Sequence, residues 1–395
     1  MRYRALLTAT ALMMPLLSAC SNGTQASSPA LPNADANWMT ARNGARPDAT
    51  AAQFAYVANE GSTNISGYKI ASNGALTEIA GSPFNAGSGP SGIAVDPTGS
   101  FAQVSNATSG DVSAYSIDAG SGALTQVKGS PFGAGTQPAG VAVDPSSKFV
   151  YVANYGVGAS SSVSAFSIKA GGALSPIKGS PFPAGTGAQY IAADPTGKFV
   201  YVPNAKSANV SGYKITSNGA LSPVPGSPFG AGTQAFGIGV DPSGKFAYVS
   251  NYGSNNVSAY TIDATNGALK NVSGSPFGAA TGPCSIVADP AGKFLYVPNN
   301  GSGNVSAYQI KSNGALTELK GSPFGAGYGA CYGAFDSTGK YLYVVNNGAD
   351  TISAYQVQTT GALKPLKGSP FPAGAGPAVI ATCRVKGGKC IPATL

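Results

Sequence analysis

The residues that could do chemistry in this chain are few. None of the 395 residues is histidine, which removes the commonest general base, any Ser–His nucleophile pair and histidine-based zinc sites. After the first twenty residues, arginine occurs only at Arg42, Arg46 and Arg384, so bidentate recognition of phosphate or carboxylate has little support. Glu60 is a weak candidate for a catalytic carboxylate, with Lys206 as a cation that could assist it. A lone carboxylate is more often a solvated loop residue, so we expect no catalytic residue, no metal site and no cofactor.

A repeated unit must position any site that the chain has. The tetrapeptide Gly-Ser-Pro-Phe recurs at intervals of 47 to 50 residues and begins at Gly81, Gly129, Gly179, Gly226, Gly274, Gly321 and Gly368. A fixed period in this range is typical of a solenoid, a propeller or a tandem array. The content of each unit is strand-like throughout, which favours the propeller.

One repeat illustrates the predicted blade. Residues 140–143 form a short apolar run typical of a buried inner strand, and residues 148–153 form a second strand of β-branched and aromatic residues. Residues 163–168 alternate strictly and predict a third strand. After a Gly-Gly hairpin turn, residues 173–177 predict an outermost strand, where Pro176 is tolerated because that edge need not donate a hydrogen bond. Four antiparallel strands per unit make one propeller blade.

The two ends of the repeated region are offset from each other. Residues 54–58 read as a second strand with no inner strand before it, and residues 378–382 read as an inner strand with no second strand after it. Their pairing would close the ring and satisfy both strand edges. The sequence therefore predicts an all-β, seven-bladed propeller over residues 53–385, closed by pairing of the N- and C-terminal strands, with a C-terminal tail over 386–395.

A ligand site is expected where the repeat varies, on the face formed by the loops that enter each inner strand and leave each second strand. Ten residues after each Gly-Ser-Pro-Phe glycine the residue type changes from blade to blade, whereas the Asn that ends each second strand and the Asp that ends most inner strands recur and predict turn-forming roles. The candidate ligand-binding residues on this face are Gln189, Tyr190, Phe236, Tyr328, Tyr332, Tyr155, Lys206 and Tyr252. They make an aromatic, weakly polar rim that could stack a sugar ring or grip a peptide.

The N-terminus predicts export and lipid anchoring. Residues 1–20 combine a basic start with an apolar run too short to span a bilayer, and they end in Leu-Ser-Ala-Cys. This ending resembles the bacterial lipobox, which implies that Cys20 is lipidated. Residues 21–52 are rich in Ser, Ala, Asn, Pro and Thr, and this composition predicts a flexible tether. We therefore expect the protein on the extracytoplasmic side of the bacterial envelope, in the periplasm or at the outer membrane, with the membrane as a partner through its anchor.

Four cysteines remain after Cys20 in what would be an oxidising compartment. Cys383 and Cys390 flank a Lys-Gly-Gly-Lys turn and are predicted to pair. Cys284 and Cys331 occupy equivalent positions in adjacent repeats, where either a disulfide or two small buried thiols would fit.

The net charge of +8 is spread along the chain without basic clusters among aromatics, so we expect no nucleic-acid partner.

The Tyr-Val-Ala-Asn segment at residues 151–154, the Asn-Val-Ser-Ala-Tyr segment at 256–260 and the Asp-Pro-Ser/Thr-Gly-Lys turns resemble the YVTN-type propeller repeat. The whole ring is similar to the seven-bladed lactonase superfamily, which includes 6-phosphogluconolactonase-like enzymes. The resemblance implies a lactonase-type hydrolase acting on an extracytoplasmic lactone. Such relatives are expected to use Arg and His in the funnel, which this chain lacks. We therefore expect a monomeric scaffold that binds an unidentified envelope ligand or protein without catalysis, with the lactonase and a multivalent sugar-binding propeller as alternatives.

Overall fold

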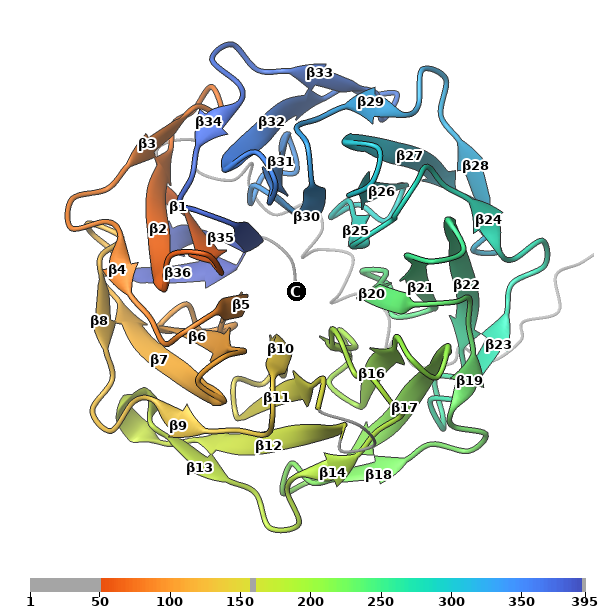
Figure 1. Ribbon diagram of the computed structural model, residues 1–395, viewed down its shortest axis with the longest axis horizontal. Coiled ribbons are helices and arrows are strands. Elements are labelled where there is room, and N and C mark those ends of the chain that lie inside the picture. Colours follow the sequence, from red (N-terminus) through yellow and green to blue (C-terminus); the bar gives the residue numbers. More distant parts are fainter. Residues whose placement is uncertain (1–50, 157–160, 393–395) are drawn as a thin grey trace, which may run out of the picture. The chain divides into compact units, whose positions relative to one another are not determined.

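The fold is a seven-bladed β-propeller. The computed structural model describes residues 51–156 and 161–392, so the signal peptide, Cys20 and nearly all of the tether lie outside the described residues. Seven antiparallel sheets surround a central axis (Figure 1). In six of them the four blade strands follow in sequence order from the inside outwards, and in the seventh the inner strand is β35, beside β1. The sequence prediction of fold class is confirmed.

Each blade has the same four strands. The inner strands are β35 (Pro377–Lys386), β5 (Pro90–Val95), β10 (Pro138–Val143), β15 (Ala192–Ala193), β20 (Ala235–Val240), β25 (Val287–Ala288) and β30 (Ala330–Phe335). The second strands are β1 (Gln53–Asn59), β6 (Phe101–Asn106), β11 (Phe149–Asn154), β16 (Phe199–Asn204), β21 (Phe246–Asn251), β26 (Phe294–Asn299) and β31 (Tyr341–Asn346). The third strands are β2 (Asn64–Ile70), β7 (Asp111–Ile117), β12 (Ser162–Ile168), β17 (Asn209–Ile215), β22 (Asn256–Ile262), β27 (Asn304–Ile310) and β32 (Thr351–Val357). The fourth strands are β3 (Leu76–Glu78), β8 (Leu124–Gln126), β13 (Leu174–Pro176), β18 (Leu221–Pro223), β23 (Leu269–Asn271), β28 (Leu316–Glu318) and β33 (Leu363–Pro365).

The Phe of every Gly-Ser-Pro-Phe begins a further two-residue strand. This short strand and the fourth strand of the blade both pair with the third strand of that blade. The seven are β4 (Phe84–Asn85), β9 (Phe132–Gly133), β14 (Phe182–Pro183), β19 (Phe229–Gly230), β24 (Phe277–Gly278), β29 (Phe324–Gly325) and β34 (Phe371–Pro372). The tetrapeptide is therefore a structural marker that ends one blade and directs the chain back towards the axis. A single 3-10 turn at Ala170–Gly172 completes the described elements.

The ring closes by pairing of segments from opposite ends of the chain. Strand β1 pairs antiparallel with β35, and Val57 lies opposite Ile380. Figure 1 shows β35 inside β1, in the position that β5 has in the next blade. This pairing satisfies edges that would otherwise be exposed, which confirms the predicted closure.

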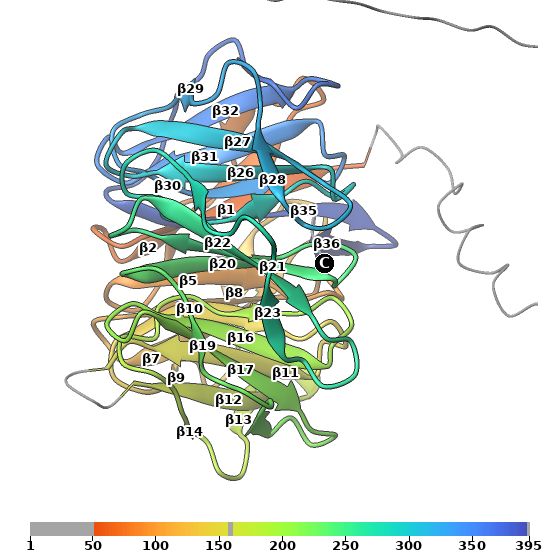
Figure 2. The same cartoon turned by 90° about the vertical axis from the view of Figure 1, so that its right-hand side faces the viewer.

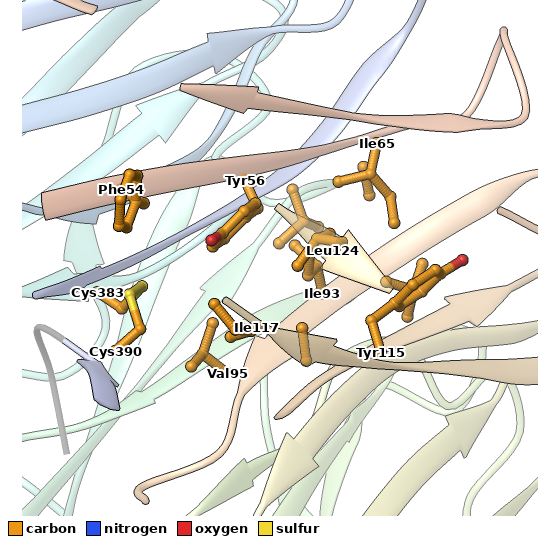
Figure 3. Close-up of a cluster of buried hydrophobic side chains, with 14 of the residues drawn as sticks. Phe54, Tyr56, Ile65, Ile93, Val95, Tyr115, Ile117, Leu124, Cys383 and Cys390 are labelled. Atoms are coloured by element: carbon orange, nitrogen blue, oxygen red, sulfur yellow. A yellow bond between two sulfur atoms is a disulfide. The ribbon is translucent and has the colours of Figure 1, made fainter. Parts of the chain in front are cut away.

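The chain continues past β35 into a hairpin. The sequence predicts a tail over residues 386–395, but Lys389–Pro392 form β36, which pairs with β35 across the Lys-Gly-Gly-Lys turn. The turn glycines Gly387 and Gly388 have φ of 60° and 76°, which favours glycine at both positions. Cys383 and Cys390 are disulfide-bonded across this hairpin, with Cα atoms 5.2 Å apart. Figure 3 shows this pair beside Phe54 at the end of the buried cluster between the first two blades.

A second disulfide joins Cys284 to Cys331, whose Cα atoms are 5.0 Å apart. It links the segment just before β25 to β30, so it connects neighbouring blades at the inner wall of the ring. The close approach arises because the inner strands converge on the axis.

The repeated polar residues have structural roles. Asp144 accepts hydrogen bonds from the backbone N–H groups of Ser146, Lys148 and Phe149, so its carboxylate holds the turn between inner and second strand. The Asn at the end of each second strand is fully buried and donates to a Ser on the third strand of its own blade, as Asn154 does to Ser164 at 2.9 Å. These contacts lie within single blades, so each Asn has a structural role in its own blade.

The propeller has two distinct faces, and we name them by their loops. The funnel face carries the loops after the second strands and before the inner strands. The turn face carries the Asp turns that join each inner strand to its second strand. Between them, an axial channel of about 470 Å³ is lined by apolar inner-strand residues such as Ile93, Val141 and Val287, and by five prolines of the Asp turns. Within the described ranges, no helix has the length and apolar content that crossing a membrane requires.

Candidate functional site

A pocket of about 460 Å³ opens on the funnel face, off the axis. It is lined by Tyr155, Gln189, Ala205, Lys206, Ala208, Thr233, Gln234, Phe236 and Tyr252. Five of the eight sequence-predicted ligand residues therefore meet here: Gln189, Phe236, Tyr155, Lys206 and Tyr252. We refer to it as the funnel pocket.

The walls of the funnel pocket come from loops that the blade architecture fixes. The backbone N–H of Tyr155 donates to the carbonyl of Gln137 at 2.9 Å, and that of Tyr252 donates to the carbonyl of Gln234 at the same distance. Each bond ties a loop after a second strand to the loop before the inner strand of the same blade. Gln189 is held at both backbone groups, since its N–H donates to Pro203 and its carbonyl accepts from Gly140.

Two polar side chains of the funnel pocket have defined contacts. The Lys206 ammonium lies over the Tyr155 ring, 4.5 Å from its centroid. A cation–π contact of this kind holds a flexible lysine in place while leaving its N–H donors free for a ligand. The Tyr252 hydroxyl donates to Asn300 Oδ1 at 3.3 Å, which links the pocket wall to the next blade.

Three aromatic side chains form a cluster at the mouth of the channel. The ring centroid of Tyr190 lies 5.3 Å from that of Phe236 and 5.2 Å from that of Tyr332. Tyr332 also lines the axial channel, whereas Phe236 lines the funnel pocket. The cluster therefore separates the two cavities, and the funnel pocket has an aromatic floor.

Glu60 directly follows β1, in a blade on the other side of the ring from that of Tyr190, and it does not line the funnel pocket. The residue is exposed, and desolvation raises the pKa of its carboxyl above the ordinary value. Burial is the main cause that raises the pKa of Tyr190, and the charges of Tyr332 and Glu60 add to it. Burial also raises the pKa of Tyr332 to about 12. Both phenols are therefore protonated at neutral pH and available as hydrogen-bond donors.

The candidate Tyr328 and two further carboxylates of the funnel face lie apart from this arrangement. Tyr328 is 74% exposed and does not line the funnel pocket. Asp111 accepts a hydrogen bond from Asn106 Nδ2 at 2.7 Å, and Asp350 accepts one from the backbone N–H of Gly376 at 2.8 Å, so both carboxylates are engaged in loop structure. Glu60 makes no such loop contact among the side-chain hydrogen bonds of the described residues.

Sequence reasoning missed two polar residues of the funnel pocket, Thr233 and Gln234. They directly precede β20, and Gln234 has a φ of 51°. Gln234 comes shortly before a position that varies strongly between blades. This proximity could have identified it, because the whole loop faces the pocket. In the described part of the chain, no cluster of three or more Cys, Asp or Glu side chains has the arrangement of a metal site.

The side chains of this site offer only a few kinds of chemical group. Aromatic rings offer stacking surfaces, Gln189, Gln234 and Thr233 offer amide and hydroxyl groups, and Lys206 offers one cation. Glu60 can accept a proton once ionised, and the neutral Tyr190 hydroxyl can donate to an oxygen that gains negative charge.

The sequence matches the family model described as "Lactonase, 7-bladed beta-propeller" over residues 48–236 and 221–332. No curated protein sequence matches the chain. A provisionally assigned 6-phosphogluconolactonase of Bacteroides fragilis superimposes with a TM-score of 0.73 at 20% identity, covering 86% of this chain and 99% of that one. The periplasmic gluconolactonase PpgL of Pseudomonas aeruginosa gives 0.72 at 18% identity, covering 84% and 99%. A protein of unknown function from Desulfotomaculum acetoxidans gives 0.67 at 19% identity, covering 84% and 99%.

These matches correct one expectation from the sequence. The missing histidine and scarce arginine led us to expect a binding scaffold without catalysis. That interpretation is contradicted, because the family match supports the lactonase alternative. The error came from treating the commonest catalytic residue types as necessary, although a carboxylate and hydroxyl donors can also assist lactone hydrolysis.

Proposed function

Because the chain belongs to the lactonase family of seven-bladed β-propellers, we propose that it is a lactone hydrolase whose active site lies at the funnel face. The family match is the observation that carries this proposal, since it extends over well more than half of the chain. The funnel pocket and its aromatic floor supply a concave site of suitable size for a single sugar ring.

Glu60 is the proposed general base. Ionised Glu60 accepts a proton from a water molecule, whose oxygen attacks the lactone carbonyl carbon. The negative charge that forms on the carbonyl oxygen is stabilised by hydrogen-bond donors, for which the neutral Tyr190 hydroxyl and the Lys206 ammonium are the candidates. The ring C–O bond then breaks, the proton passes from Glu60 to the departing ring oxygen, and the product is the open hydroxy acid.

The proposed substrates are sugar lactones. Their hydroxyl groups suit the amides of Gln189 and Gln234, and their ring faces suit Tyr155 and Tyr252. Two structural neighbours, the provisionally assigned 6-phosphogluconolactonase and the periplasmic gluconolactonase, support the same class. We further propose that the enzyme acts as a monomer outside the cytoplasm, anchored by lipid at Cys20.

The test is hydrolysis of a panel of sugar lactones, with and without a phosphate group, by the purified protein. We expect turnover that falls by at least about a hundredfold in Glu60→Gln, the size typical of losing a general base. The matched control is Glu318→Gln, which makes the same change on the outer strand β28. No turnover across the panel from a folded sample, or equal turnover in Glu60→Gln and the wild type, would refute the proposed site.

A further inference from the structure

The turn face carries a ring of exposed lysines. Five Asp turns are followed by a lysine at the start of the second strand, and all five side chains are exposed: Lys148, Lys198, Lys245, Lys293 and Lys340. Two more lysines stand in the outer hairpin turns of the same face. Lys169 follows Ile168, whose N–H donates to the Lys148 carbonyl at 2.8 Å, and Lys311 is placed in the same way beside Lys293.

The acidic residues of this face are mostly covered. The carboxylates of the Asp turns are buried, and Asp194, for example, accepts from the backbone N–H groups of Thr196, Lys198 and Phe199. Asp118 and Asp263, in the outer hairpin turns, are exposed. The turns of this face therefore carry seven exposed lysines and two exposed aspartates, and the buried carboxylates reduce its total charge further.

The funnel face has the opposite character. Among the described residues its acidic side chains are Glu60, Asp111 and Asp350, and its basic side chain is Lys206. The charge is thus distributed asymmetrically between the two faces, and a charged surface would orient the propeller.

The last hairpin adds to the basic face. Strand β35 is longer than the other inner strands, and it runs from Pro377, which pairs with Asn59 at the funnel face, to Lys386 at the turn face. Lys386 and Lys389 are both exposed at its tip. Figure 2 shows β35 and β36 projecting beyond the remaining strands on one side of the ring.

The N-terminal segment joins the propeller at this same face. Gln53 begins β1 opposite Arg384, and Gln53 Oε1 accepts hydrogen bonds from the N–H and hydroxyl of Ser337 in an Asp turn. The described part of the chain therefore begins at the turn face. The turn face is also where five Asp-turn prolines line the end of the apolar channel, inside the ring of lysines.

From the charge asymmetry and the point of chain entry, we propose that the turn face docks on an anionic phospholipid surface. The lysine ring and the β35–β36 tip contact the lipid phosphates, and the funnel face points away from the membrane, open to soluble substrate. The contact is electrostatic, so it strengthens with the fraction of anionic lipid and weakens with salt. It depends on neither the proposed hydrolase activity nor the identity of the substrate.

The experiment uses the full lipid-anchored chain in vesicles of phosphatidylcholine alone or of phosphatidylcholine with phosphatidylglycerol. An amine-reactive reagent labels exposed lysines, and mass spectrometry reads each site. We expect labelling of Lys386 and Lys389 to fall by about tenfold or more in the anionic vesicles at low salt and to recover at high salt, while labelling of Lys206 stays unchanged.

Two charge-reversal variants sharpen this result. Changing Lys148, Lys198, Lys245, Lys293 and Lys340 to Glu should abolish the protection of Lys386 and Lys389. Changing Lys128, Lys178, Lys320, Lys364 and Lys367 to Glu alters the net charge equally but on exposed positions of the outer rim, and should leave the protection largely intact. Equal labelling in both vesicle types, equal loss of protection in both variants, or protection of Lys206 in place of the turn-face lysines would overturn the proposal.

Discussion

The hydroxyl of Tyr343 donates a 2.8 Å hydrogen bond to the carbonyl of Gly74, joining the blade of β31 to the blade of β1. Both groups are buried within the seam where the ring closes. Five other blades have the same bond to the next blade, made by Tyr56, Tyr151, Tyr201, Tyr248 and Tyr296. Two kinds of contact therefore hold the seam closed: the β1–β35 strand pairing, and the same side-chain hydrogen bond that joins other neighbouring blades.

Replacing Tyr343 with Phe should lower the free energy of unfolding by about 1–2 kcal/mol, because the Gly74 carbonyl loses its partner in a buried setting. Thermal or denaturant unfolding measures the change. Tyr201→Phe, which removes the equivalent bond to Gly267 away from the seam, is the control. We expect equal losses, since the ring should unfold as one unit; a much larger loss at Tyr343 would show instead that the seam opens on its own.

Gln103 occupies the position of these tyrosines in the blade of β6, and it is fully buried. Neither polar atom of its side-chain amide has a hydrogen-bond partner. Gln103→Tyr should therefore raise the free energy of unfolding by about 1–3 kcal/mol, by removing unsatisfied groups and supplying a hydroxyl for the Gly172 carbonyl. Gln103→Leu, which removes the amide without adding a donor, should give a smaller gain. A loss of stability in the Tyr variant would mean that this blade has closed around the smaller side chain.

The fold was predictable because each of its structural features recurs in the sequence up to seven times. The strand-ending Asn residues, the Asp turns and the Asn-Gly hairpins recur at one period, and each depends only on contacts within a blade or between neighbours. The C-terminal hairpin was missed as a strand because it occurs once and extends β35 beyond the repeat.

The site was less predictable because it depends on contacts that the repeat does not describe. Glu60 and Tyr190 belong to blades on different sides of the ring, and no spacing along the chain reveals that the charge of Glu60 adds to the raised pKa of Tyr190. Tyr328 looked equivalent to its pocket-lining neighbours, yet its loop directs it into solvent. The interpretation as a binding scaffold was wrong for a chemical reason: the absence of histidine does not exclude a reaction that a carboxylate can assist.

The two disulfides should differ in their effect on stability. The bond between Cys284 and Cys331 closes a segment of 47 residues, whereas that between Cys383 and Cys390 closes one of 7. In the chain-entropy model, the longer loop contributes about 4 kcal/mol and the shorter about 2.5 kcal/mol. Unfolding of the paired Cys→Ala variants under non-reducing conditions should reproduce this order. The reverse order would show that the hairpin contacts of β36, more than loop entropy, determine the contribution.

Glu60→Gln should have opposite effects on activity and stability. Burial raises the pKa of Glu60, so the folded protein binds the proton more tightly than the unfolded chain and loses stability as the pH rises from the unfolded pKa through the folded one. The neutral glutamine avoids this cost, and the variant should melt at a higher temperature than the wild type at neutral pH. The difference should vanish at acidic pH, below the unfolded pKa, where Glu60 is protonated in both states.

Wild-type kcat/KM should rise with pH over the range in which stability falls, because the base works only when ionised. Glu318→Gln on the exposed outer strand should change neither property. A Glu60→Gln variant that loses activity and stability together would mean that the carboxylate supports the loops of the funnel face and does not take part in the reaction.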